Sequence, residues 1–306
     1  MTTPVEEAYR ACREIARREA KNFYYSFVAL PEPKRNAICA VYAFMRHADD
    51  LSDDESLSIA ERRVNLANWL DAWHRASQGE ATSDPVFIAL ADARARFNIT
   101  CELLDQLVQG TAMDLHRGIL AEGAYDTYAT FDDLYRYCYL VASVVGLVCI
   151  RIFGYSDARA EKLAEETGIA FQLTNILRDV REDVERRRVY LPLEDMKRYH
   201  VDVSELAALA QKPGPITANQ RELLTVEAKR AGGYYKSGYA LLPLISADAR
   251  PALKVLISIY HDLLLKIESS GYEVFQHRVS VPAAKKLWIL CGGMLQVFWN
   301  RMTGAK

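Results

Sequence analysis

The stretch GIAFQLTNILRDVREDVERRRVYLP, residues 168–192, decides the fold class of this chain. Four polar side chains in it recur at positions i, i+3, i+7 and i+11: Gln172, Asn175, Asp179 and Asp183. At about 100° per residue, they fall within about an 80° sector of one helix face. Apolar residues flank this polar stripe on both sides. We interpret it as a helix that lines a functional site inside a helical protein, rather than as a solvent-facing stripe.

Helical periodicity also dominates the rest of the chain, and the alternation of β-branched and polar residues that predicts strands is missing. A loop at residues 121–130 ends at Thr130, which is expected to cap a helix through FDDLYRYCYLVASVVGLV. No shift in composition, fixed-period repeat or low-complexity tract divides the chain. We therefore predict an all-α protein in which residues 1–306 form a single domain, one helical bundle with a central cavity.

The composition excludes some classes of function. Lys and Arg number 38 against 40 Asp and Glu, so the basic excess of a nucleic-acid-binding protein is lacking. The six cysteines include no CxxC pair and no disulfide-like cluster, which is typical of reduced thiols. The first 22 residues have a charged, helical pattern that does not resemble a secretory signal. We expect a cytoplasmic protein that does not bind nucleic acid.

The longest uncharged apolar stretches are residues 139–150 and 287–299. Both are shorter than the roughly 20 residues that a membrane-spanning helix needs, so we predict that they are buried core helices. The second stretch carries Trp288, Phe298 and Trp299. Peripheral contact of this stretch with a membrane is the alternative.

A first acidic motif precedes the polar stripe in the segment YAFMRHADDLSDD, residues 42–54. In a helix, Tyr42, Arg46, Asp49 and Asp53 fall within about a 60° sector, and Asp50 is turned about 100° away. A solvated helix end is the alternative interpretation. An EF-hand is excluded because the ligand alternation is broken and the sixth position of the loop is not glycine.

The two motifs together indicate a metal-dependent reaction of diphosphates. Asp179 and Asp183 are one helical turn apart, so their charges repel by about 3 kcal/mol at an effective dielectric of about 20. Mg²⁺ relieves such repulsion and bridges one or two carboxylates to substrate phosphates. Two opposed acidic faces would therefore hold diphosphates and neutralise a departing pyrophosphate. An allylic carbocation left behind needs a dry, apolar pocket, for which the chain has 17 tyrosines and 10 phenylalanines.

From about residue 10 to about residue 292, the chain resembles the squalene/phytoene synthase family. YAFMRHADD is similar to the family's first aspartate motif, and QLTNILRDVREDVERRRVYLP to its second. MDL at residues 113–115 and YCYLVASVVG at residues 137–146 resemble its central helices. The resemblance implies an isoprenoid synthase bundle whose two motifs face each other across the cavity. The implied reaction is the head-to-head condensation of two prenyl diphosphates.

The resemblance also implies roles for individual residues. Asp49, Asp53, Asp179 and Asp183 would hold two or three Mg²⁺ ions, with Asp50 in support. The catalytic residues would be Tyr42, Arg46, Arg178 and Tyr260. The substrate-binding residues would be Lys21, Asn22, Phe23, Phe27, Val141, Ala142, Gly146, Ala164, Gly168, Gln172, Asn175 and Arg278.

The chain departs from the family pattern at several places. Ala20, Lys21 and Asn22 stand where many members have serines that bind diphosphate, and Lys21 would compensate by its charge. Arg187 replaces the glycine that usually precedes the Arg-Val-Tyr-Leu-Pro stretch, and Ser143 replaces another glycine. None of these changes removes a predicted metal ligand.

The sequence leaves the exact reaction open. The substrates would be two farnesyl diphosphates, which give presqualene diphosphate or squalene-type products, or two geranylgeranyl diphosphates, which give phytoene. We favour farnesyl diphosphate only slightly, because the tail GYEVFQHRVSVPAAKKLW resembles bacterial members of both branches and Cys39 is small enough to leave a deeper tunnel. We do not expect NADPH as a cofactor, since no strand followed by GxGxxG is found. A terpene cyclase or chain-elongating enzyme, and a non-catalytic scaffold of the same fold, are the alternatives; the sequence does not predict an oligomeric state.

Overall fold

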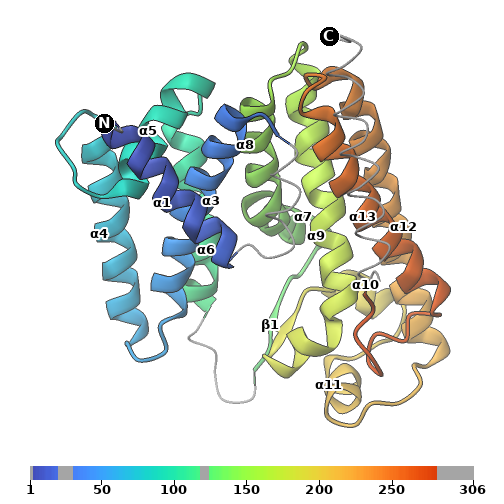
Figure 1. The fold of residues 1–306 in the computed structure, drawn as a ribbon. Helices are drawn as coiled ribbons and strands as arrows, with labels where there is room; N and C mark the ends of the chain where they lie inside the picture. Colours follow the sequence, from blue (N-terminus) through green and yellow to red (C-terminus); the bar gives the residue numbers. More distant parts are fainter. Residues whose placement is uncertain (1–2, 20–29, 118–123, 281–306) are drawn as a thin grey trace.

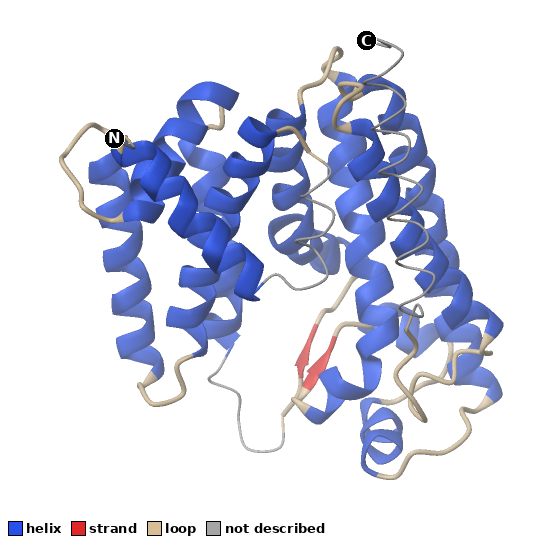
Figure 2. Cartoon of the chain, in the orientation of Figure 1, coloured by secondary structure: helices blue, strands red, loops and turns tan. Residues whose placement is uncertain are grey.

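The computed structural model describes residues 3–19, 30–117 and 124–280. Helices fill most of these ranges (Figures 1 and 2), so the expected all-α fold is confirmed. One core of buried hydrophobic residues extends from Ala8 to Val279 and joins both halves of the bundle.

The first half of the bundle carries the first acidic motif on α3. Its helices are α1 (Pro4–Glu19), α3 (Glu32–Asp53), α4 (Ile59–Ser77), α5 (Pro85–Phe97) and α6 (Cys101–Arg117). Proline in the first turn starts α3, because its fixed φ suits a helix start and its missing N–H has no helical partner there. Phe44 of α3 lies against Trp69 and Trp73 of α4, with ring centroids 5.9 and 5.7 Å apart. This aromatic packing holds α3 in place against α4.

The second half is built around the long helix α9, which carries the polar stripe (Figure 1). Its helices are α7 (Phe131–Cys138), α8 (Val144–Phe153), α9 (Arg159–Glu185), α10 (Leu193–Arg198), α11 (Val203–Gln211), α12 (Ala218–Leu241) and α13 (Arg250–Ser269), with a short 3₁₀ turn η2 (Leu242–Leu244). Helices α8, α11, α12 and α13 all contact α9. Because α9 is covered on several sides, its partly exposed residues mark the face that is left for a site.

Two short parallel strands interrupt the helical fold in the part of the chain that the structure describes. Strand β1 (Asp126–Thr127) pairs with β2 (Arg188–Val189), so that Asp126 lies opposite Arg188. Between α9 and β2 the backbone of Arg187 has φ of 61°. This left-handed conformation favours glycine, the residue that the family resemblance implies at this position.

A π-helical segment, η1 (Tyr139–Ser143), joins α7 to α8 and packs between α6 and α9. A Cβ at Gly110 of α6 would lie 2.8 Å from the Leu140 carbonyl oxygen, and one at Gly168 of α9 would lie 2.5 Å from Ser143 Cα. Both glycines therefore allow the neighbouring helices to approach η1 closely. Such π-helical segments occur often at functional sites.

The stretch Phe131–Phe153, which comprises α7, η1 and α8, is long and apolar enough to cross a membrane by length and composition alone. It is longer than the apolar run seen in the sequence, because the predicted Thr130 cap forms a capping box with Asp133 and starts the helix earlier. Its contacts with α6 and α9 place it inside the bundle. Most of residues 139–150 are nevertheless only partly buried, so the prediction of a buried core helix holds in part. The other apolar stretch, residues 287–299, lies outside the described residues.

Candidate active site

The first acidic motif occupies the last turns of α3, and Asp49 is its most buried aspartate. The hydroxyl of Thr111 on α6 donates to Asp49 Oδ1 at 3.0 Å. Burial raises the pKa of Asp49, and the neighbouring Asp53 raises it further, against the opposing effects of Thr111 and Arg46. The anionic form of Asp49 is therefore disfavoured in this structure, and a bound cation would stabilise it.

The other members of the first motif lie around Asp49 as the helical register predicts. Arg46 forms an ion pair with Asp50 one turn later on the helix. Tyr42, one turn before Arg46, is partly buried, and burial raises the pKa of its hydroxyl. Asp50 and Asp53 are exposed at the end of the helix. The motif thus presents one sheltered carboxylate and two that face solvent.

The polar stripe on α9 keeps the register predicted from the sequence. Gln172, Asn175, Asp179 and Asp183 are all partly exposed, whereas Leu173, Ile176 and Val180 between them are buried. Asn175 donates a long hydrogen bond, 3.4 Å, from Nδ2 to Gln172 Oε1. The stripe therefore belongs to the open face of an otherwise buried helix.

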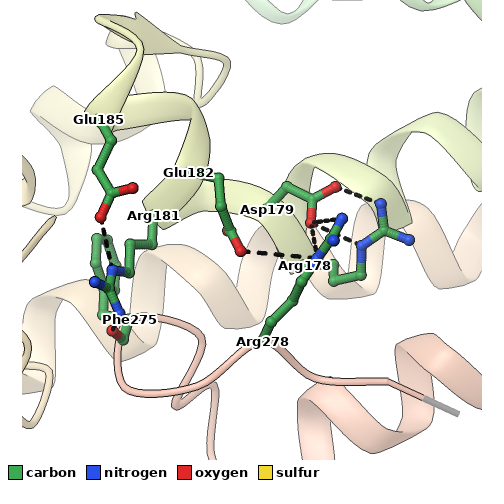
Figure 3. Close-up of polar contacts among 7 residues, drawn as sticks. All are labelled: Arg178, Asp179, Arg181, Glu182, Glu185, Phe275 and Arg278. Atoms are coloured by element: carbon green, nitrogen blue, oxygen red, sulfur yellow. Dashed lines mark hydrogen bonds and ion pairs between the residues drawn. The ribbon is translucent and has the colours of Figure 1, made fainter.

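Asp179 is surrounded by two arginines (Figure 3). Arg178 donates from Nε to Asp179 Oδ1 at 2.8 Å and from Nη2 to Oδ2. Arg278, from the segment after α13, donates from Nε to the same Oδ1 at 2.9 Å. The residues that the resemblance assigns to metal and to diphosphate therefore contact each other directly.

Asp183 has a different environment. Burial, together with the charge of Asp179, raises the pKa of Asp183 to about 7, although Arg188 and Arg186 act against the shift. A divalent cation that replaces the proton of such a carboxyl group stabilises its anionic form. The paired aspartates of α9 therefore have the properties of ligands for a hard cation.

Tyr260 of α13 reaches the polar stripe from the side. Its ring stacks on Phe171, with centroids 4.4 Å apart and planes 16° from parallel. Burial raises the pKa of Tyr260, and Arg178 and Asn175 lower it. The hydroxyl group therefore lies next to the residues that surround Asp179, where the resemblance placed it.

A cavity of about 580 Å³ connects the ends of the two motifs. Asp53 and Glu55 line it from the α3 side, and Arg186 and Arg188 from the turn after α9, with Ser52, Arg62 and Leu115 completing the wall. Arg188 also lines a smaller pocket beside Asp183. The sequence analysis did not select Arg62, Arg186 or Arg188. The run of three arginines at residues 186–188 was the available signal, since three adjacent cations at an acidic site indicate an anionic ligand.

Comparison with known proteins identifies relatives along nearly the whole chain. The model of the family described as squalene/phytoene synthase matches residues 16–285. The chain belongs to the squalene/phytoene synthase family. It is 34% identical over 308 residues to the 15-cis-phytoene synthase of Synechococcus elongatus, covering 95% of this chain and 94% of the relative. It is 35% identical over 295 residues to the phytoene synthase of Mycobacterium tuberculosis, covering 95% and 92%.

Solved structures show the same family likeness. A dehydrosqualene synthase crystallised with a ligand aligns with a TM-score of 0.81 and 29% identity, over 97% of this chain and 99% of that one. The squalene synthase from Alicyclobacillus acidocaldarius aligns with a TM-score of 0.79 and 27% identity, over 89% and 97%. The expected reaction, head-to-head condensation of prenyl diphosphates, is confirmed at the level of the family. The chain is accordingly a prenyltransferase.

The predicted tunnel residues of this squalene/phytoene synthase family member gather where η1 and α8 cross α9. Val141, Ala142 and Gly146 are partly exposed there, whereas Ala164 and Gly168 are buried. A Cβ at Gly146 would lie 3.2 Å from the Ala164 carbonyl oxygen. The contacts show a helix-packing role for the two glycines, and tunnel lining by the five residues stays a prediction. Four predicted substrate-binding residues lie outside the described residues: Lys21, Asn22, Phe23 and Phe27.

The residues present fit Mg²⁺ that arrives with a substrate. Among residues 3–19, 30–117 and 124–280, no three His, Cys, Asp or Glu side chains converge closely enough to hold a metal by themselves. The carboxylates are arranged instead as pairs one helical turn apart, Asp49 with Asp53 and Asp179 with Asp183. Mg²⁺ is commonly bound by one or two carboxylates and completed by waters and substrate phosphates. This donor set therefore suits a metal shared with a diphosphate.

Proposed function

We propose that this enzyme is Mg²⁺-dependent and joins two geranylgeranyl diphosphates head to head, through a cyclopropylcarbinyl diphosphate, to phytoene. The observation that carries the metal and diphosphate part is the convergence of Arg178 and Arg278 on Asp179. Guanidinium groups bind diphosphate oxygens through paired N–H donors, and carboxylates bind Mg²⁺. One group of side chains thus contains both a carboxylate that can bind the metal and guanidinium groups that can bind the diphosphate.

The proposed roles follow from position. Arg46, Arg178 and Arg278 would orient the diphosphates, and Tyr260 would add a hydroxyl donor beside them. Mg²⁺, held by the paired aspartates, would neutralise the negative charge of the departing pyrophosphate. Val141 and Ala142 on η1 would offer apolar surface to the prenyl chains and keep water from the cation that forms.

The choice of the longer substrate rests on the relatives. Proteins named phytoene synthase are 34 and 35% identical to the chain, whereas the structures named dehydrosqualene and squalene synthase are 29 and 27% identical. The small Cys39, which the sequence analysis considered as room for a deeper tunnel, is fully buried. Burial raises the pKa of the Cys12 thiol in α1, and the nearby Cys39 raises it further. Cys39 therefore packs between α1 and α3, and its size is no argument for a deeper tunnel.

We also propose that the protein is not a reductase, since neither phytoene nor the cyclopropyl intermediate requires a hydride. The absence of a GxGxxG sequence supports this only weakly, and the names of the relatives support it further.

One experiment tests these proposals together. Purified protein is incubated with geranylgeranyl or farnesyl diphosphate, with Mg²⁺ or with EDTA, and with or without NADPH. Products are identified by mass spectrometry before and after dephosphorylation. We expect phytoene from geranylgeranyl diphosphate only when Mg²⁺ is present. A product formed equally well in EDTA would contradict the metal dependence. Turnover of farnesyl diphosphate but not of geranylgeranyl diphosphate would contradict the proposed substrate length. Squalene formed only with NADPH would identify a reductase. Cyclised or elongated products, or none at all, would favour the alternatives of the same fold.

A further inference from the structure

The carboxylate of Asp179 has both oxygens engaged by arginine. Oδ1 accepts from Arg178 Nε at 2.8 Å and from Arg278 Nε at 2.9 Å, and Oδ2 accepts from Arg178 Nη2. The side chain of Asp179 is 17% exposed, so water competes little for these oxygens. Both lone pairs of Oδ1 are used, so a metal ion can bind Oδ1 only if a guanidinium group withdraws.

Arg278 reaches Asp179 from an anchored segment, residues 271–280. Phe275 of this segment is fully buried, and its carbonyl oxygen accepts a long hydrogen bond, 3.4 Å, from Arg181 (Figure 3). Arg221 of α12 donates to the Gly271 carbonyl oxygen at the start of the segment. The contact between Arg278 and Asp179 therefore results from how the backbone is held, rather than from chance placement of a loose side chain.

Arg278 is nevertheless free to change partners. Its side chain is 57% exposed, and its Nε lies 3.7 Å from Glu182 Oε1, one turn nearer the end of α9. A diphosphate at this site would offer several anionic oxygens to the same guanidinium group. Movement of Arg278 from Asp179 to that acceptor would expose Asp179 Oδ1 without any movement of α9.

We propose that Arg278 gates metal entry at the second acidic motif: it covers Asp179 until a diphosphate draws it away, so that metal and diphosphate bind together. The proposal rests on the metal dependence proposed above. By linkage, the diphosphate increases the affinity for metal and the metal increases the affinity for diphosphate by the same factor. Metal without diphosphate is disfavoured, which keeps the paired aspartates from being filled unproductively.

The test is the affinity for Mn²⁺, as a paramagnetic substitute for Mg²⁺, measured by electron paramagnetic resonance without any diphosphate. A residue that only binds diphosphate should change this affinity no more than another nearby cation does. If Arg278 covers Asp179, Arg278→Gln should tighten Mn²⁺ binding about two- to fivefold, the range for a partly exposed ion pair. The same variant should bind Mn²⁺ with inorganic pyrophosphate more weakly than the parent. Arg278→Lys, which keeps the charge, should return the Mn²⁺ affinity toward that of the parent.

Arg186→Gln is the matched control, because it removes a positive charge that acts on the neighbouring Asp183 but is not among the hydrogen-bond partners that the structure gives Asp179. It should change the Mn²⁺ affinity less than Arg278→Gln does. Equal effects of the two variants, or unchanged or weaker Mn²⁺ binding by Arg278→Gln, would overturn the gating role while leaving the metal dependence standing. If the parent bound no Mn²⁺ even with pyrophosphate, both the gating role and the metal dependence would be wrong. Circular dichroism checks that each variant is folded.

Discussion

Gly168 of α9 lies so close to Ser143 of η1 that a Cβ at residue 168 would be 2.5 Å from the Ser143 Cα. The Ser143 hydroxyl secures the same contact by donating to the Glu165 carbonyl oxygen at 2.6 Å. This contact sets the distance between the helix that carries the second acidic motif and the π-helical segment beside it.

We therefore expect Gly168→Ala to destabilise the protein by about 2 kcal/mol or more, because backbone rather than a flexible side chain must move. Gly233→Ala in α12 is the control, since nothing lies within 4 Å of a Cβ there and alanine favours helix by up to about 1 kcal/mol. Urea unfolding of both variants measures the two effects. Equal changes in the free energy of unfolding for the two variants would show that the close approach at Gly168 does not affect stability.

Single replacements of the paired aspartates should abolish turnover without unfolding the protein. Asp49→Asn, Asp53→Asn, Asp179→Asn and Asp183→Asn should each lower kcat by about two orders of magnitude or more, because each removes an anionic ligand for Mg²⁺. Glu185→Gln is the control: this exposed carboxylate on α9 pairs with Arg181 and should keep its activity. A loss of thermal stability with near-normal specific activity would indicate structural roles instead.

Asp183→Asn should stabilise the metal-free protein, and more strongly at high pH. The folded-state pKa of Asp183 is about 7, above its ordinary value of 3.8, because burial and Asp179 disfavour the anion. The folded state therefore holds the proton longer than the unfolded chain, and stability falls as pH rises from about 4 to about 7. The asparagine variant escapes this loss. Its advantage should be about 2 kcal/mol at pH 8, after allowance for partial exposure, and smaller at pH 5.

Denaturant titrations in EDTA at both pH values would measure this difference. An advantage of the Asp183→Asn variant that does not change with pH, or that is larger at pH 5, would contradict the raised pKa. Adding Mg²⁺ with pyrophosphate should reverse the order, because only the parent gains the metal as a ligand of the folded state.

Arg187→Gly should stabilise the protein by up to about 1 kcal/mol. Arg187 has φ of 61°, and glycine adopts this conformation without the steric cost that a Cβ brings. Arg186→Gly is the control, because Arg186 has φ of −87°, where glycine only adds freedom to the unfolded chain. Differential scanning calorimetry should give opposite shifts of Tm for the two variants. A lower Tm for both would show that the Arg187 side chain stabilises the protein more than its left-handed backbone conformation destabilises it.

Much of the site could be predicted from local sequence. Helical spacing alone placed Tyr42, Arg46 and Asp49 on one face of α3, and it placed the polar stripe on the open face of α9. The reason is that side-chain direction within a helix repeats with a fixed angle per residue, so neighbours three and four positions apart share a face in any protein. The Thr130 cap was predictable on the same local basis. The resemblance to a family then supplied the expected roles of these residues.

Other features depend on how distant segments pack. Asp179 and Arg278 are 99 positions apart, and their contact requires segment 271–280 to be held across α9. Arg186 and Arg188 share a cavity with Asp53 only because the turn after α9 returns to the end of α3. Local spacing also could not show that Gly168 serves a close helix crossing or that Cys39 faces α1. The sequence by itself determined which side chains share each helix face, since that geometry is local; the tertiary structure decided which faces meet, since that is set by the burial of the whole core.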